Sequence, residues 1–296
     1  MKFLVRTTLL AGLVVGLAGL PAIAAQSQQQ QQQKPQPGQP QAQPGQQQAQ
    51  PGQQQPQPGQ QPAAQAPAAP AQNPAEVKAY KKFYDLPAAQ AQDIISAGGD
   101  FLKKFPDSEY NSGVYARMAN AYRQLGNEDK MFEMGEDSLK LNPNNVDMLS
   151  LLAYSIPRRI DPNDLDSSQK LQQAEDYAKR GIQLIPTMIK PATMPDERFA
   201  AAKNEELASC HSGLGLVYFY QHNIPGMITE MELAVKLDPS PDPTDQFLLG
   251  YAYTQAGRYA DAVTPLTACA AQPPMASRCK QLLDTVKQHV KAAPKQ

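Results

Sequence analysis

The sequence predicts an all-α fold, a solenoid of about four and a half helical hairpins closed by a C-terminal capping helix. Three observations lead to this prediction. From about residue 74 onward, apolar residues recur at helical spacing between short turns. Segments that begin at Tyr115, His211 and Gln246 repeat one spacing pattern. The last segment, ASRCKQLLDTVKQHVKAA, has one apolar face that includes Leu283 and Val286, as expected of a terminal cap.

The first 24 residues predict an export signal. Lys2 and Arg6 precede an apolar run, and the run ends in a small-x-small cleavage pattern closed by Ala24. The alternative is an uncleaved anchor, because Thr7–Ala25 is about long enough to span a bilayer. No cysteine follows the run directly, which excludes a bacterial lipid anchor. We therefore expect a periplasmic or secreted protein with no membrane span after cleavage.

Residues 25–73 consist almost entirely of Gln, Pro, Ala and Gly, with Lys34 as the only charged residue. A chain without large apolar side chains gains too little from burial to offset its ordering entropy, so this segment is predicted to be disordered. A spacer is one interpretation, and a wall-binding or self-associating tail is the other.

Three segments share four landmarks at identical spacing. A small residue precedes a tyrosine by three positions, a turn residue follows the tyrosine by four, and a proline follows it by 21. The landmarks are Ala119, Tyr122, Gly126 and Pro143; Gly215, Tyr218, His222 and Pro239; and Gly250, Tyr253, Gly257 and Pro274. The pattern resembles the tetratricopeptide repeat (TPR), a helix-turn-helix unit of about 34 residues. The resemblance implies a right-handed solenoid, and it implies that each small residue contacts the residue twelve positions later, namely Met131, Met227 or Ala262.

The repeat domain is expected over residues 74–293. Its units are expected at 74–109, 112–145, 146–188, 195–241 and 243–276, followed by a cap at 276–293. In the third unit the turn is about nine residues longer than usual, with Ser167 or Ser168 as the cap of the next helix. In the fourth unit the first helix is extended back to about Pro195, with Thr193 and Asp196 resembling a helix-start box.

The residues that could perform chemistry do not form a recognisable site. The net charge of −1 does not favour nucleic-acid binding. His211, His222 and His289 are not spaced as metal ligands, and carboxylates such as Asp176 and Glu230 are interpreted as solvated surface. We therefore expect no enzyme activity, no cofactor and no metal.

Cys269 and Cys279 are candidates for a disulfide, because a helical hairpin would bring them together and export favours oxidation. The alternative is two buried thiols. Cys210 is left over and is expected to be a small packed side chain, with a reactive thiol as the alternative.

The TPR resemblance implies that the first helix of each unit lines a concave groove. By helix phase, the groove residues are Asn120, Arg123, Gln124, Tyr154, Arg158, Leu216, Phe219, Tyr220, Phe247, Tyr251, Thr254 and Gln255. The aromatic members would anchor a peptide or a partner's helix, or else belong to the core between repeats. Ala116 stands where the family's carboxylate-binding lysine would be, so that clamp is not expected.

The predicted function is a non-catalytic periplasmic or secreted scaffold that binds a protein or peptide. The run FLKKFPDSEY, which ends at Tyr110, resembles helix ends of periplasmic TPR proteins of exported bacterial type. The alternative function is therefore a cell-envelope assembly or peptidoglycan-associated factor that uses the Gln/Pro-rich tail to reach the wall, with peptidoglycan-associated proteins as partners.

Overall fold

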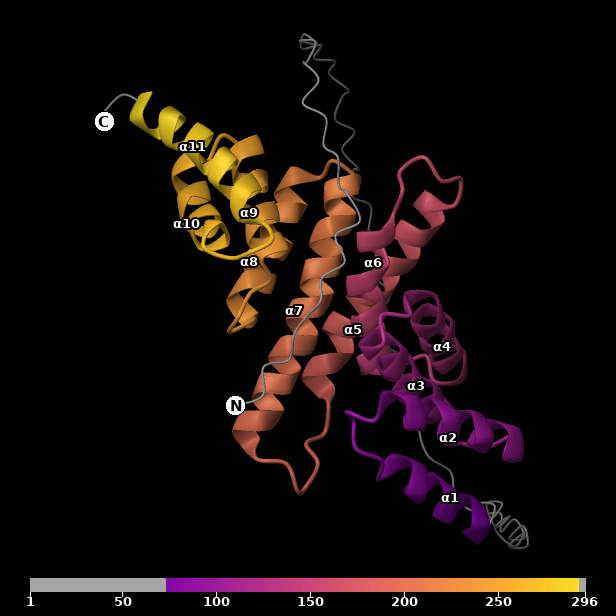
Figure 1. The fold of residues 1–296 in the computed structure, drawn as a ribbon. Helices are drawn as coiled ribbons and strands as arrows, with labels where there is room; N and C mark the ends of the chain where they lie inside the picture. The colour runs from indigo at the N-terminus through magenta and orange to yellow at the C-terminus, as the bar shows by residue number, and fades with distance from the viewer. Residues whose placement is uncertain (1–72, 293–296) are drawn as a thin grey trace, which may run out of the picture. The chain divides into compact units, whose positions relative to one another are not determined.

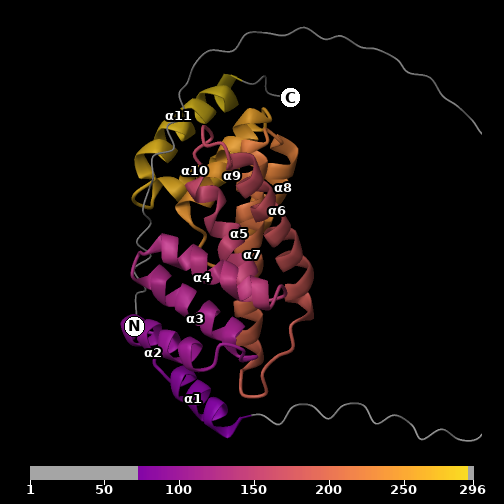
Figure 2. The same cartoon turned by 90° about the vertical axis from the view of Figure 1, so that its right-hand side faces the viewer.

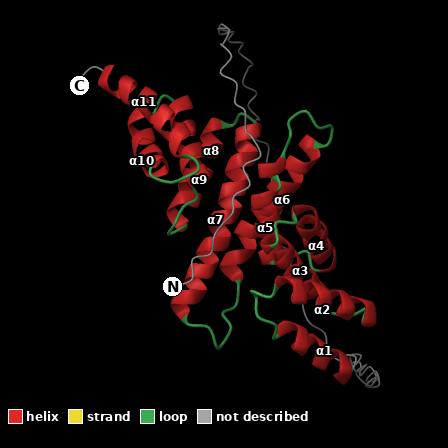
Figure 3. Cartoon of the chain, viewed as in Figure 1, coloured by secondary structure: helices red, strands yellow, loops and turns green. Residues whose placement is uncertain are grey.

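The computed structural model describes residues 73–292 (Figure 1). The predicted signal peptide and, apart from Asn73, the predicted disordered segment lie outside the described residues. Over this range helices joined by loops make up the structure, and there is no strand (Figure 3). The α-helices are α1 (Pro74–Tyr84), α2 (Ala91–Lys104), α3 (Asn111–Gln124), α4 (Glu128–Leu141), α5 (Val146–Ser155), α6 (Ser167–Leu184), α7 (Asp196–Tyr220), α8 (Ile224–Leu237), α9 (Pro243–Gln255), α10 (Tyr259–Ala270) and α11 (Ala276–Ala292). Two short 3₁₀ helices, η1 (Pro157–Arg159) and η2 (Ile185–Thr187), follow α5 and α6.

Successive helices pack as hairpins. The pairs are α1 with α2, α3 with α4, α5 with α6, α7 with α8 and α9 with α10, and α11 covers α10. Helix α7 is the exception, because it packs on both helices of the preceding pair as well as on α8 (Figures 1 and 2). This arrangement confirms the all-α repeat fold that the sequence predicts. Every helix in the described range is too short or too polar to cross a bilayer.

The turns inside the repeats explain the recurring landmark residues. Gly126 and Gly257 have φ of 71° and 72°, and His222 at the equivalent position has φ of 56°. A residue in the left-handed conformation there ends the first helix of the hairpin, and glycine adopts that conformation without steric cost. The next helix then begins with an asparagine cap in two units: Asn127 accepts from the Lys130 amide at 3.2 Å, and Asn223 caps α8 in the same way. Asn223 directly follows the left-handed His222, so two adjacent residues end α7 and begin α8.

Two predicted capping interactions at helix N-termini are absent from the structure. Neither Ser167 nor Ser168 caps α6: the Ser167 hydroxyl donates to the carbonyls of Asp161 and Asp164 and so closes the long turn instead. Helix α7 begins after Pro195 without any side-chain cap, so the Thr193 box does not form. At Ser167, hydrogen bonds to the preceding turn replace the helix cap.

The side chain nearest to the small residue lies further along the second helix than the predicted contact. A Cβ at Gly215 would lie nearest to Met231, and one at Gly250 nearest to Leu266, both sixteen positions later rather than twelve. Met227 is nonetheless fully buried.

Two large hydrophobic clusters form the core of residues 73–292. The first lies among α1 to α6 and the second among α7 to α11. Helix α7 contributes to both, because Val217 belongs to the first cluster and Leu216 to the second. Between α5 and α7 the backbones come very close at Gly213, where a Cβ would lie 2.2 Å from the Ala153 carbonyl oxygen.

Candidate functional site

Four aromatic side chains from α7 and α9 contact one another ring to ring. Phe219 and Tyr220 end α7, and Phe247 and Tyr251 lie one turn apart on α9. The ring centroids are 5.4 Å apart for Phe219 and Tyr220, 5.8 Å for Phe219 and Tyr251, and 6.5 Å for Phe247 and Tyr251. We call these four residues the aromatic row. All four are half-buried and rest on the second hydrophobic cluster, so each has one side in the core and one side open.

Next to the aromatic row, a buried polar network joins α5 and η1 to α9. The Arg158 guanidinium lies 3.4 Å above the Tyr154 ring centroid. Its Nη2 donates to Asp245 Oδ1 at 2.8 Å and to Ser212 Oγ at 2.7 Å. The Tyr154 hydroxyl donates to Asp242 Oδ2 at 3.2 Å. We call these five residues the Arg158 network.

The network changes the interpretation of Arg158. The sequence placed this residue among the groove residues, but its donors are directed at Asp245, Ser212 and its own helix end. Burial raises the pKa of the Asp245 carboxyl, while Arg158 and the Ser212 hydrogen bond act in the opposite direction. A buried ion pair of this kind costs desolvation and is most useful where it holds two elements in one arrangement. Arg158 is therefore a structural tie between α5 and α9.

A second acidic group lies at the α5–α7 contact. The Ser150 hydroxyl donates to Glu206 Oε2. Burial raises the pKa of the Glu206 carboxyl to about 8. Repulsion from the Asp147 and Glu205 carboxylates acts in the same direction, and the Arg123 guanidinium opposes it. Near neutral pH, Glu206 is therefore mostly protonated.

The other predicted groove residues are dispersed. Leu216 is only 4% exposed and belongs to the second cluster, so its assignment to the groove is wrong. Thr254 is half-buried and donates to the Gly250 carbonyl at 2.7 Å. Asn120 is half-buried and donates to the Ala116 carbonyl at 3.2 Å. Three are exposed near helix ends, namely Arg123, Gln124 and Gln255.

Two of the three cysteines lie beside Phe247 of the aromatic row. Cys269 and Cys279 are joined in a disulfide, with Cα atoms 5.8 Å apart. Both are buried with Met275, and Phe247 of the aromatic row packs against this cluster. Cys210 is a buried free thiol whose pKa is raised to about 12, chiefly by burial and secondarily by Glu206. Such a thiol is unreactive at neutral pH.

One predicted surface carboxylate proves to be structural. Glu230 Oε2 lies 2.6 Å from Nδ1 of the buried His211, across the α7–α8 hairpin. The interpretation of Glu230 as solvated surface is therefore wrong. Sequence spacing could not show it, because the pair forms only in the register of that hairpin.

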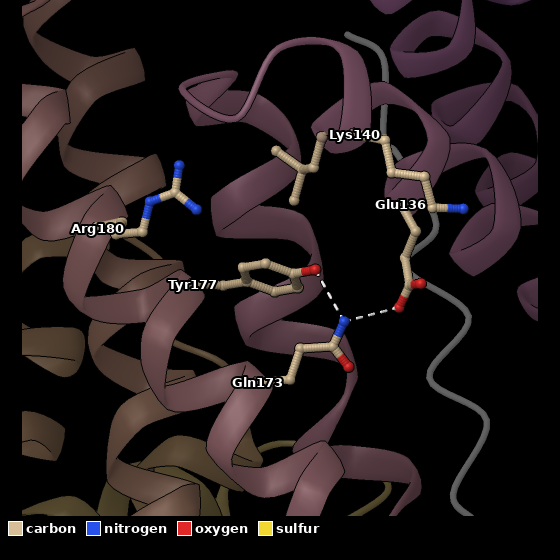
Figure 4. A pocket seen from close by; sticks show the side chains of 6 residues that line it. Glu136, Lys140, Gln173, Tyr177 and Arg180 are labelled. Carbon is tan, nitrogen blue, oxygen red and sulfur yellow. Dashed lines mark hydrogen bonds between the residues drawn. The ribbon is translucent and has the colours of Figure 1, made fainter.

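A shallow cleft of roughly 270 Å³ lies between α4 and α6 (Figure 4). In it, Gln173 donates to Glu136 at 3.0 Å and to the Tyr177 hydroxyl at 2.8 Å, as the dashed lines show. Lys140 pairs with Asp137, and Arg180 donates to nearby backbone and side-chain oxygens of the α4–α5 turn. Because these polar groups satisfy one another, the cleft offers little to a ligand. Within residues 73–292 no three His, Cys, Asp or Glu side chains are grouped to hold a metal.

Sequence reasoning missed Asp242, Asp245 and Ser212. A signal existed for Asp242, because an aspartate directly before a proline is typical of a helix start, and Asp242 indeed caps α9 through the Thr244 amide at 2.7 Å. Its second role, as acceptor for Tyr154, depends on a side-chain contact that reaches from α5 to the start of α9. Nothing local in the sequence indicates that contact.

Residues 112–145 match the family model described as tetratricopeptide repeat. Among solved structures, a thermophilic TPR protein of Thermus thermophilus is 17% identical, with 72% of this chain and 99% of that chain covered and a TM-score of 0.42. The TPR2AB domain of yeast Sti1 in complex with pHSP90 is 19% identical, covering 72% and 83%, with a TM-score of 0.29. The APC/C hetero-tetramer Cut9–Hcn1 is 15% identical, covering 71% and 46%, with a TM-score of 0.34. None of the curated proteins matches this sequence.

Proposed function

We propose that this chain is a non-catalytic scaffold, exported to the periplasm or secreted, that binds a protein or peptide segment over the aromatic row. The aromatic row is the observation on which this proposal depends. Half-buried Phe and Tyr side chains supply large contact area at little entropic cost, because the core already holds them in place. The export part of the proposal rests on the signal-like residues at the N-terminus.

The TPR match supports a binding role, since helical-repeat units expose extended surfaces suited to peptides. The Arg158 network supports it as well, because it fixes the position of α9 relative to α5 beside the aromatic row. A preorganised surface loses less entropy on binding than one that must first be assembled.

The proposal can be tested by selecting, from a random library, 12-residue peptides that bind to residues 73–292 of the protein. The enriched peptides are then titrated against Tyr251→Ala, whose ring is half-buried, and against Thr285→Ala on the exposed side of α11. We expect Tyr251→Ala to weaken binding by about tenfold or more, as for a central aromatic anchor, and Thr285→Ala to leave it unchanged. Peptides that bind the Tyr251→Ala protein as tightly as the wild type, with both proteins folded, would overturn the proposal.

A further inference from the structure

Three helical segments beside the aromatic row carry no cationic residue. Helix α5, helix α9 and the second half of α7, residues 207–220, contain no lysine and no arginine. Arg158 follows α5 in the chain, and its guanidinium is already paired with Asp245 and stacked on Tyr154. These three segments and Arg158 therefore offer a ligand no free positive charge.

Carboxylates, in contrast, border the row. Asp161 is exposed, lies next to the Ile160 carbonyl that the Tyr220 hydroxyl contacts at 3.5 Å, and interacts electrostatically with Tyr220. Asp242 is half-buried at the start of α9. Arg158 interacts electrostatically with both Asp245 and Asp242, so this one cation is outnumbered by the three carboxylates Asp161, Asp242 and Asp245 beside the aromatic row.

We propose that the partner segment is basic, with lysine or arginine alternating with apolar or aromatic residues. This inference rests on the proposed function and specifies the chemistry of the same surface. The aromatic rings accept the apolar side chains and present faces that attract cations. Asp161 and Asp242 pair with the lysine or arginine side chains at the edge.

An acidic segment is disfavoured by the same arrangement. Its carboxylates would approach Asp161 and Asp242, where the neighbouring Arg158 is already engaged, and like-charge juxtaposition across an interface is costly. A neutral apolar segment would gain the ring contacts but not the charge pairs. The three classes of peptide are therefore expected to rank as basic, neutral and acidic in order of decreasing affinity.

The test uses three fluorescein-labelled octapeptides of alternating sequence, Lys-Phe, Ser-Phe and Glu-Phe, titrated by anisotropy against the full mature chain. The basic peptide should bind about tenfold tighter than the neutral one in about 50 mM salt, and the gap should narrow at about 500 mM, where the Debye length falls to a few ångströms. The acidic peptide should bind most weakly.

Two variants localise the charge effect. Asp161→Asn keeps the turn's acceptor for the Asn163 amide, and Asp242→Asn keeps a capping side chain for α9, so both should fold. Each should reduce the preference for the basic over the neutral peptide by about threefold or more. Asp284→Asn is the matched control, because it removes the same charge from the exposed side of α11 and should change nothing.

The outcomes separate the two proposals. Equal binding of the basic and neutral peptides, both weakened by Tyr251→Ala, would overturn the inference about charge while leaving the aromatic surface as the binding site. A loss of preference in Asp284→Asn as large as in Asp161→Asn would also overturn it, because the attraction would then come from net charge alone. Binding of all peptides that is unaffected by Tyr251→Ala would overturn the proposed function itself.

Discussion

Replacing Gly213 by alanine tests the close approach of α5 and α7 on which the Arg158 network depends. An added Cβ would lie 2.2 Å from the Ala153 carbonyl oxygen, whereas real Cβ atoms essentially never approach closer than 3.0 Å. The obstacle is backbone, so the two helices must separate by roughly 1 Å, and close-packed interiors resist such shifts. Overpacking costs typically 1–3 kcal/mol, and a backbone obstacle belongs at the upper end, so we expect a loss of about 3 kcal/mol.

For a domain of this size, about 3 kcal/mol corresponds to a fall in Tm of about 6–12 °C. Thermal unfolding followed by circular dichroism measures it. Gly99→Ala is the matched control, since Gly99 lies inside α2 and a Cβ there would meet nothing within 4 Å. That substitution should stabilise by about 0.5–1 kcal/mol through reduced backbone entropy of the unfolded chain. If both variants melt at the same temperature, the reasoning about the α5–α7 contact is refuted.

Three further predictions concern the polar and sulfur groups. Replacing Cys269 and Cys279 together by serine should lower the free energy of unfolding by about 2–3 kcal/mol in urea titration, because the disulfide closes a short loop; equal stability of the oxidised wild type and the variant would contradict this. Arg158→Met should lower the free energy of unfolding by about 3–5 kcal/mol, since it leaves the Asp245 carboxylate buried without its partner. Adding Asp245→Asn should recover part of that loss, and strictly additive effects in the double-mutant cycle would be evidence against the network. Glu206 has a folded-state pKa of about 8, above its ordinary value of 4.5, so the folded state binds the Glu206 proton more tightly than the unfolded state does. The free energy of unfolding should therefore fall as pH rises from about 4.5 to 8, and Glu206→Gln should flatten this part of the profile measured by urea titration. An unchanged slope in the variant would show that another group titrates.

The sequence predicted the local parts of the fold well, because they are encoded locally. Left-handed turns at Gly126 and Gly257 follow from the residue types and their spacing, and His222 was recognised from its equivalent position. The segment before His211 is too long to be a turn, and this correctly predicted that α7 extends back to about Pro195. These features need no knowledge of which helices meet.

The candidate site was only partly predictable, because its contacts join helices distant in sequence. Helix phase correctly grouped Phe219 with Tyr251, since equivalent positions recur once per repeat. The same argument assigned Arg158 to a binding surface. It could not predict the ion pair with Asp245, because that residue is 87 positions away in the sequence. Charge pairing between distant helices depends on their register and curvature, and neither is set by periodicity.

Helix α7 gives this repeat protein a mechanical property that its regular hairpins alone would lack. Adjacent residues Leu216 and Val217 point into different hydrophobic clusters, so a single turn of helix is the shared boundary of both. In a simple array, tension applied to the two ends would peel off one hairpin after another. Here, a pulling force that reaches α7 must release both clusters at once, so extension should show one high-force event at this helix among lower ones from the terminal hairpins.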